Sequence, residues 1–276
     1  MNRPHRKPSD RYACSLVLAA HGSLASVSAN APFYEMAEEL QQHGIFAKVT
    51  PALLNGSPRI NEVLSLLPAG DVVVVPLMTS EGYYCKQVLP DQLKSNPEFE
   101  QFRVMITPAI GVHPMIPAVV ADRVRTLADA HRINNAETTA VIVGHGTTRH
   151  PDSGKATVAL CDQVRRELGA AASGIQVEAG FIDQQPDIQK VAATLTGRNV
   201  IVIPFLISRG PHATEDVPGA FGLPTGDSLT FPVTVKRAGG LCICDGPVGL
   251  YPEVTELCLQ MAADRMTGLE TVISSS

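Results

Sequence analysis

The stretch Ala140-Val-Ile-Val-Gly-His-Gly-Thr-Thr-Arg-His-Pro-Asp-Ser-Gly-Lys155 decides how the rest of the chain is interpreted. A run of β-branched residues ends at Gly144, His145 follows on a turn between two glycines, and an amphipathic segment begins at Lys155. A buried strand that leads through a turn into a helix is typical of parallel α/β sheets. Because such sheets place ligand chemistry at the carboxyl ends of their strands, His145 is a candidate functional residue.

Strand-like and helix-like segments alternate on both sides of this stretch. In the first half the order is strand 15–20, a helix around Phe33, Met36 and Leu40, strand 46–54, a helix begun by Pro58 and strand 72–78. In the second half it is strand 140–143, a helix from Lys155, strand 175–182, a helix from Pro186 and strand 200–207. This alternation predicts βαβ units and parallel sheets that are buried on both faces.

The two halves are repeats of one another. Pro58 and Pro186 are 128 residues apart (186 − 58), and the same spacing separates Ile60 from Ile188, Pro76 from Pro204 and Gly82 from Gly210. Each half also closes with a helix, at 115–127 and 253–266. We therefore predict an α/β protein of two similar domains, 12–130 and 138–270, each a parallel sheet flanked by helices. The polar stretch 131–138 is the predicted linker, and a pseudo-twofold arrangement would place a cleft between the domains.

Composition narrows the classes of function. A net charge of −5 and a pI near 5.9 argue against a nucleic-acid-binding or anionic-membrane surface, because such binding needs a clustered positive field. The apolar run 16–20 after the basic N-terminus is too short for a signal peptide or a membrane span, so we expect a cytoplasmic protein. Of the scattered cysteines only Cys242 and Cys244 lie close together, and they fit small core residues better than a metal or redox site.

Three polar side chains follow successive strands of the second half. His145 follows the first strand, Asp183 follows the second, and His212 lies in the loop after the third. Two imidazoles and a carboxylate suit a divalent ion such as Co(II), Fe(II), Ni(II) or Zn(II). The simpler alternatives are a turn histidine, an aspartate that caps the helix begun at Pro186, and a histidine in a surface loop.

Two kinds of phosphate site are disfavoured by the same stretch. A P-loop needs a glycine five residues before its Gly-Lys pair and a Ser or Thr after it, whereas Arg149 and Ala156 stand at those places around Lys155. A phosphohistidine catalyst would place an arginine before the His-Gly pair, where Gly144 stands. We therefore expect no nucleotide cofactor.

Several motifs together resemble a known family. They are Gly144-His-Gly-Thr147, the strand end Phe181-Ile-Asp183 before Pro186, Gly210-Pro-His212 with Asp216-Val-Pro218, and Gly246-Pro-Val-Gly249. These motifs are similar to those of the class II chelatases of the sirohydrochlorin type, the CbiX and SirB family, in two tandem copies. The resemblance implies insertion of cobalt or iron into sirohydrochlorin without ATP, on the way to cobalamin or siroheme.

Carried over to this sequence, the resemblance assigns roles to the second half. It makes His145 and His212 the catalytic and metal-handling pair, with Asp183 as a further metal ligand where the family commonly has Glu. In the first half His21 matches the histidine turn, but Tyr84 and Asn55 stand at the other two positions. The first half is therefore interpreted as a degenerate copy that forms the opposite wall of the cleft.

Sirohydrochlorin carries many carboxylates, so the resemblance also implies local basic or polar groups. The candidates for substrate binding are Arg149, Lys155, Arg209, Thr147, His21 and Tyr84, with Lys86, Tyr83, Ser23 and Thr148 as further contacts. Solvated loop charge is the alternative for each basic residue. Neutral imidazole can ligate a metal and accept a pyrrole proton near pH 7. The tandem repeat favours a monomer. A non-catalytic tetrapyrrole or metal carrier is the competing function, and a metal-dependent hydrolase is a third.

Overall fold

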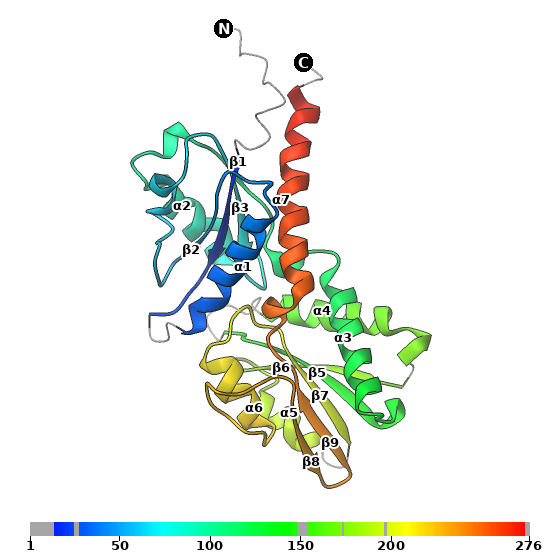
Figure 1. Cartoon of the computed structure of the whole chain (residues 1–276). Helices are drawn as coiled ribbons and strands as arrows, with labels where there is room; N and C mark the ends of the chain where they lie inside the picture. Colours follow the sequence, from blue (N-terminus) through cyan, green and yellow to red (C-terminus); the bar gives the residue numbers. More distant parts are fainter. Residues whose placement is uncertain (1–13, 25–27, 148–153, 173, 196–197, 274–276) are drawn as a thin grey trace. The chain divides into compact units, whose positions relative to one another are not determined.

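A computed structural model describes residues 14–24, 28–147, 154–172, 174–195 and 198–273, with side chains up to 268. These residues form two compact units. The first unit holds the chain up to Ile110 and again from Thr255, and the second unit holds Gly111–Val254. Each unit is an α/β layer structure, which confirms the predicted fold class (Figure 1).

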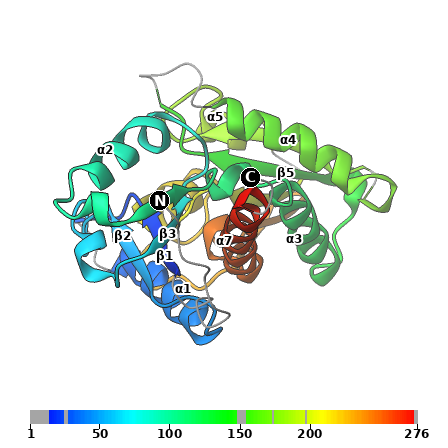
Figure 2. The ribbon, with the colours of Figure 1, turned by 90° about the horizontal axis from the view of Figure 1, so that it is seen from above.

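The first unit is built on a parallel sheet in the order β2-β1-β3-β4. Its strands are β1 (Cys14–Ala20), β2 (Val49–Leu53), β3 (Asp71–Leu77) and β4 (Arg103–Ile106), and its helices are α1 (Ala31–Gln42), α2 (Leu89–Lys94) and, from Thr255 on, α7 (Pro252–Ile273). Helices α1 and α2 lie on opposite faces of the sheet, as the view from above shows (Figure 2). Burial on both faces explains why β1 and β3 are almost entirely apolar.

The helix expected after Pro58 does not form. Its apolar residues Ile60, Val63 and Leu64 are buried as expected, but the chain makes only a 3₁₀ turn, Val63–Leu66. Pro68 disfavours helical geometry at the residue before it, and Leu67 is extended accordingly (φ −103°, ψ 151°). The spacing of apolar residues after Pro58 therefore predicts correctly which side chains are buried, but it does not predict the secondary structure.

The second unit is built on a mixed sheet in the order β6-β5-β7-β9-β8. Its strands are β5 (Thr138–Gly144), β6 (Gln176–Phe181), β7 (Asn199–Pro204), β8 (Val233–Arg237) and β9 (Gly240–Cys244). Strand β8 runs antiparallel to β9, so the expectation of a purely parallel sheet is wrong at this edge. The reason is the short connection Ala238-Gly239, since a tight turn can join only antiparallel neighbours.

Helices cover both faces of this second sheet. Helices α3 (Ile116–Ala130) and α4 (Lys155–Leu168) lie on one face, and α5 (Ile188–Thr194) and α6 (Val217–Ala220) lie on the other (Figure 1). Short 3₁₀ turns complete the two units at Ser28–Asn30, Val63–Leu66, Phe99–Gln101, Ile110–Val112, Asn135–Glu137, Ala170–Ala172 and Val248–Leu250.

The compact units divide the chain differently from the predicted ranges 12–130 and 138–270. Helix α3, expected to close the first domain, packs against α4 and β7 in the second unit. Helix α7, expected to close the second domain, belongs to the first unit from Thr255 onward. Sequence periodicity locates a helix, but it does not say which sheet covers its apolar face.

The cysteines are free thiols, and Cys242 and Cys244 are fully buried in the core of the second unit. Burial raises the pKa of the Cys242 thiol to about 11, so it stays protonated near neutral pH. Both residues are therefore small core side chains, as expected.

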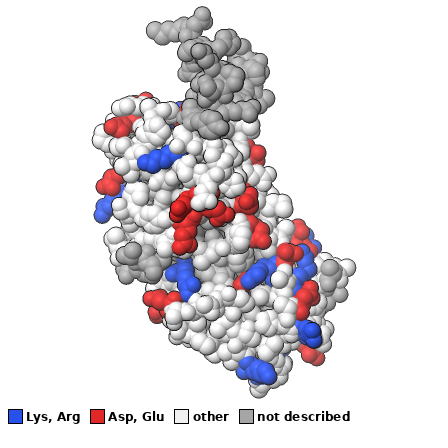
Figure 3. Space-filling model, viewed as in Figure 1, with Lys and Arg blue, Asp and Glu red and all other residues white. Residues whose placement is uncertain are grey.

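In the part of the chain that the structure describes, no helix has the length and apolarity that a membrane span requires. On the face drawn in Figure 3, Lys and Arg side chains are scattered among acidic ones.

Candidate active site

His145 is the first residue beyond strand β5, at the carboxyl edge of the second sheet. Two glycines fix the chain around it. A Cβ at Gly144 would overlap the Thr157 side chain of helix α4, so the strand end can approach the helix only without one. Gly146 has φ +69°, which favours glycine, and a Cβ there would lie 2.6 Å from Cβ of Gln184. The turn therefore presents His145 at the sheet edge, where its side chain is 46% exposed.

His212 does not lie in an irregular loop as expected but begins a π-helical turn, His212–Asp216. The Val217 N–H donates to the carbonyl of His212 and closes this wider turn. Pro218 follows and has no N–H to offer the Thr214 carbonyl, which instead accepts from Gly226 at 2.9 Å. The wide turn aims His212 across the sheet edge toward His145.

The two imidazoles face each other through their Nε2 atoms. These atoms are 3.2 Å apart, and the rings meet edge to face with centroids 4.6 Å apart and planes at 87°. The side chain of His212 is 45% exposed, much like that of His145. The structure therefore brings together the two histidines that the sequence places 67 residues apart.

The opposite nitrogen of each ring has a different partner. Nδ1 of His145 lies 2.7 Å from the Gly146 carbonyl, and Nδ1 of His212 lies 2.6 Å from the Asp216 carboxylate. Asp183 approaches His145 only on this Nδ1 side, with Oδ2 at 3.7 Å. Its carboxylate therefore lies at the back of the ring rather than between the two Nε2 atoms. Within the described residues, no three His, Cys, Asp or Glu side chains form a ready metal cluster.

Asp183 also does not cap the following helix. That cap is Asp187, whose Oδ1 accepts from the backbone N–H groups of Gln189 and Lys190. Asp183 instead joins the two turns through its backbone, because its N–H donates to the His145 carbonyl at 2.9 Å. The capping alternative for Asp183 is thereby removed, and its carboxylate lies near Nδ1 of His145.

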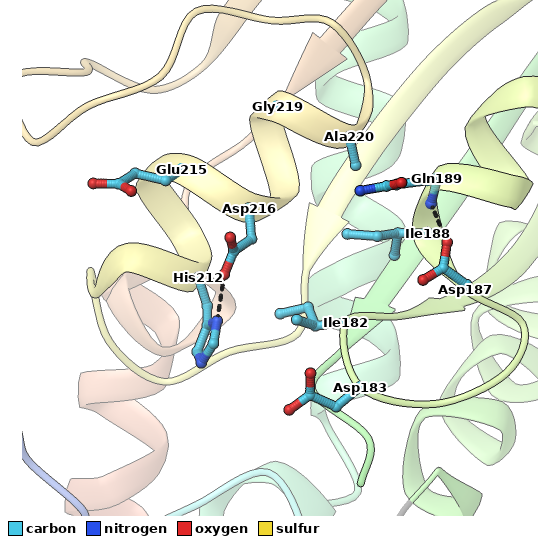
Figure 4. A pocket seen from close by; sticks show the side chains of 10 residues that line it. All are labelled: Ile182, Asp183, Asp187, Ile188, Gln189, His212, Glu215, Asp216, Gly219 and Ala220. Carbon is cyan, nitrogen blue, oxygen red and sulfur yellow. Dashed lines mark hydrogen bonds and ion pairs between the residues drawn. The ribbon is translucent and has the colours of Figure 1, made fainter. Parts of the chain in front are cut away.

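A hollow of about 410 Å³ opens beside this pair. His212, Glu215 and Asp216 line one side from the π-helical turn, and Asp183 and Asp187 line the other side from the segment after β6 (Figure 4). The remaining lining residues are Ile182, Ile188, Gln189, Gly219 and Ala220. The hollow is rich in carboxylates, as a passage for a cation would be.

The first unit repeats the arrangement with other side chains. His21 follows β1, and its ring meets that of Tyr84 edge to face, with centroids 4.9 Å apart and planes at 79°. Nδ2 of Asn55 lies 3.3 Å from Nδ1 of His21, and Tyr83 packs beside Tyr84. The three positions singled out in the first half therefore do meet, as an imidazole, a phenol and an amide.

The basic candidates for substrate binding lie in different surroundings. Lys155 is exposed in the first turn of α4, and Thr147 is partly exposed on the histidine turn. Arg209 donates to the carbonyls of Asp227 and Leu229 and stacks on Phe231, so it holds the segment before β8. Arg149 and Thr148 lie outside the described residues.

Asp216 was missed by the sequence reasoning. Its motif Asp216-Val-Pro218 served only as part of the family resemblance, although it stands four residues after His212. Residues four apart on a helical turn share a face, so the His-x-x-x-Asp spacing before a proline was the available signal.

A family model described as CbiX matches the chain twice, over residues 15–127 and 139–265. A probable sirohydrochlorin cobaltochelatase of Halobacterium salinarum is 28% identical over an alignment of 271 positions that covers 91% of this chain and 91% of that protein.

Three solved structures share the fold. A multi-domain protein of Deinococcus radiodurans with structural similarity to chelatases has a TM-score of 0.69 at 24% identity; the match covers 91% of this chain and 55% of that protein. CbiX, the terminal enzyme for siroheme biosynthesis in denitrifying bacteria, has a TM-score of 0.67 at 20% identity over 90% and 97% of the two chains. SirB of Bacillus subtilis in complex with cobalt has a TM-score of 0.63 at 16% identity over 91% and 94%.

The family match spans both repeats and most of the chain, and each histidine turn described above lies inside one of the two matched ranges. The chain is therefore a member of the CbiX family.

Proposed function

We propose that this protein inserts a divalent metal ion, cobalt or iron, into sirohydrochlorin without a nucleotide, with His145 and His212 as the reacting side chains. The observation that carries the proposal is the facing pair of Nε2 atoms, 3.2 Å apart and half exposed beside an acidic hollow. The family membership and the cobaltochelatase relative support the same reaction.

The spacing of the pair suits two nitrogen ligands of one ion. At metal–nitrogen distances of about 2.0–2.1 Å, nitrogens 3.2 Å apart subtend about 100° at the metal, between octahedral and tetrahedral angles. Two protein ligands leave most of the coordination sphere open for water or for the pyrrole nitrogens. An ion held this loosely can be passed on to the macrocycle.

Insertion also releases two pyrrole protons, which the site must accept. Once the ion has moved to the macrocycle, the vacated Nε2 atoms of His145 and His212 can each take up a proton. The carboxylates of Asp183 and Asp216, on the Nδ1 sides, are placed to stabilise the imidazolium that results. The same two side chains thus serve as metal ligands first and as bases second.

Substrate recognition is assigned to the basic and polar residues around the histidine turns. Lys155 and Thr147 belong to the segment that carries His145 and suit the peripheral carboxylates of sirohydrochlorin. Arg149, Arg209, His21 and Tyr84 complete the proposed set.

The test is anaerobic metal insertion into sirohydrochlorin, followed by the absorbance change of the macrocycle, with Co(II) and Fe(II) in parallel. We expect His145→Ala and His212→Ala each to lower the rate by about 10²–10⁴-fold. His131→Ala is the matched control, because it removes an imidazole at the end of α3, outside the site.

A tetrapyrrole or metal carrier is the competing function, and the same assay separates the two. A carrier would bind sirohydrochlorin without inserting metal, and the two alanine variants would leave that binding unchanged. Normal tetrapyrrole binding with no insertion by the unmodified protein would therefore replace the proposed reaction with a carrier function.

A further inference from the structure

Asp216 contacts the Nδ1 edge of the His212 ring, on the side away from His145. Its Oδ2 lies 2.6 Å from Nδ1 of His212, a hydrogen-bonding distance, whereas Asp183 stays at 3.7 Å from Nδ1 of His145. The contact runs along one π-helical turn, from its first residue to its last (Figure 4). Of the two carboxylates beside the histidine pair, Asp216 alone makes a hydrogen bond to an imidazole.

This contact determines which nitrogen of His212 carries the hydrogen. An ionised carboxylate only accepts hydrogen bonds, so Nδ1 of His212 is the donor and Nε2 is left with its lone pair. The Gly146 carbonyl likewise only accepts, so Nδ1 of His145 is also the donor. Both Nε2 lone pairs are then available at the 3.2 Å gap. Two bare lone pairs at this distance repel each other, and a cation between them removes the repulsion.

The turn itself does not need a carboxylate at this position. The first unit has the same π-helical turn, Tyr84–Val88, followed by Pro90 where the second has Pro218. Val88 stands at the place of Asp216, and Tyr84 stands at the place of His212 (216 − 88 and 212 − 84 are both 128). The carboxylate therefore occurs in the repeat whose π-helical turn begins with an imidazole, and the other repeat folds the turn without it.

We propose that Asp216 is a positioning residue that holds His212 as the Nδ1–H tautomer and so keeps its Nε2 lone pair directed at the metal. The metal-handling role of His212 is taken from the function proposed above. His145 receives the same orientation from a backbone carbonyl, which no substitution of a side chain removes. Asp216 is thus the side chain through which the donor state of the pair can be changed.

The first test reads the tautomer directly and needs no tetrapyrrole. Long-range ¹H–¹⁵N correlation spectra of the full chain distinguish Nδ1–H from Nε2–H imidazole, and His145→Gln and His212→Gln assign the signals. We expect the Nδ1–H form for His212 in the unmodified protein and loss of that preference in Asp216→Val, which copies the residue of the first unit. Glu215→Gln, the neighbouring loss of charge, should leave the tautomer of His212 unchanged.

The second test is Co(II) affinity, measured by titration of the protein with the metal alone. Removal of such a partner typically weakens metal binding by about 10–100-fold, which is the loss expected for Asp216→Val, and Asp216→Glu should restore most of it. In the insertion assay Asp216→Val should lower kcat with little change in the KM for the tetrapyrrole. Asp122→Asn, on the exposed surface of α3, controls for loss of one negative charge.

The possible outcomes are decisive. An Nε2–H tautomer of His212 in the unmodified protein, or Co(II) affinity within about threefold in a folded Asp216→Val, overturns the assignment. If Asp216→Val fails to fold by circular dichroism, Asp216→Ala, which also removes the acceptor, carries the same two measurements. If the tautomer and affinity results hold but the unmodified protein inserts no metal, the proposed function fails and the orientation of His212 by Asp216 stands.

Discussion

The two histidine turns have nearly the same backbone and different chemistry. In both, a glycine with positive φ follows the histidine, Gly22 at +65° and Gly146 at +69°. In both, the partner ring comes from a π-helical turn after the third strand and meets the histidine edge to face. Glycines and prolines therefore fix where the two rings meet, independently of what those rings are.

The side chains at three other positions separate the two sites. The second unit has His212, Asp183 and Asp216 where the first has Tyr84, Asn55 and Val88. At these three positions the second unit therefore has an imidazole and two carboxylates, and the first unit has a phenol, an amide and an isopropyl group. The comparison shows that the two repeats share the same turn geometry while the side chains on those turns differ.

Exchanging one residue between the repeats should have the largest effect. His212→Tyr installs the residue of the first unit, and a neutral phenol neither ligates a divalent ion well nor accepts a proton near pH 7. We expect the rate of cobalt insertion to fall by about 10²–10⁴-fold while the far-ultraviolet circular dichroism stays the same. Activity within tenfold of the unmodified protein would mean that His145 alone suffices.

Strand β9 of the second unit is followed by a buried carboxylate, whereas the corresponding strand of the first unit, β4, is followed by Thr107. Asp245 follows β9, is 1% exposed, and accepts from Arg123 on α3 and from the Tyr251 hydroxyl. Asp245→Ala leaves the Arg123 guanidinium without its carboxylate partner. Because Arg123 is about one third exposed, water can solvate part of its charge, and we expect the free energy of unfolding to fall by about 2–4 kcal/mol. Urea denaturation measures it.

Thr107, which follows β4 in the first unit, provides the matched variant. Its hydroxyl donates to the Pro108 carbonyl at 2.9 Å and has no charge to leave unpaired. Thr107→Ala should cost only about 0.5–1.5 kcal/mol. Equal losses for Thr107→Ala and Asp245→Ala would contradict the importance of the ion pair between Asp245 and Arg123.

The strand ends before the two histidines differ by a methyl group. Strand β1 ends in Ala20, whereas β5 ends in Gly144, where a Cβ would overlap the Thr157 side chain. We expect Gly144→Ala to lower stability by about 1–3 kcal/mol, visible as a lower thermal midpoint. Gly210→Ala is the control, since nothing lies within 4 Å of a Cβ there. A midpoint as high as that of Gly210→Ala would show that α4 shifts without cost.

The smallest effect concerns alkaline pH and Tyr251. Burial, followed by the neighbouring Asp245 carboxylate, raises the pKa of the Tyr251 hydroxyl well above its usual value near 10. Its contribution to stability is present below that usual value and is lost as pH rises further, because the unfolded chain then releases a proton that the folded chain keeps. Between about pH 9 and 11 the unmodified protein should therefore lose more stability than Tyr251→Phe, by up to about 1.4 kcal/mol per pH unit. The free energy of unfolding is measured by urea denaturation at each pH. If it fell equally with pH in the unmodified protein and in Tyr251→Phe, Tyr251 would not contribute to the pH dependence.

Much of the architecture could be predicted because burial and repetition leave direct marks in the sequence. The buried strands and the amphipathic helix α4 are periodic, and four residue pairs at one spacing revealed the duplication. The meeting of His145 with His212 followed from the rule that parallel strands share a carboxyl edge.

What could not be predicted depends on contacts far apart in the chain. The spacing of apolar residues after Pro58 indicates burial but not the extended geometry before Pro68. The antiparallel strand β8 depends on a short turn, and the bonds from Arg209 to the backbone of Asp227 and Leu229 depend on where that segment runs. Asp216 was overlooked because its partner nitrogen is chosen by the π-helical turn.

The placement of α7 has a consequence for the order in which the chain is completed. The second unit is inserted, in sequence, between Ile110 and Thr255 of the first. A ribosome therefore finishes the unit that contains His145 and His212 before it has supplied helix α7 of the unit that it began with. Shortening the chain at its C-terminus would, for the same reason, damage first the structure encoded at the N-terminus.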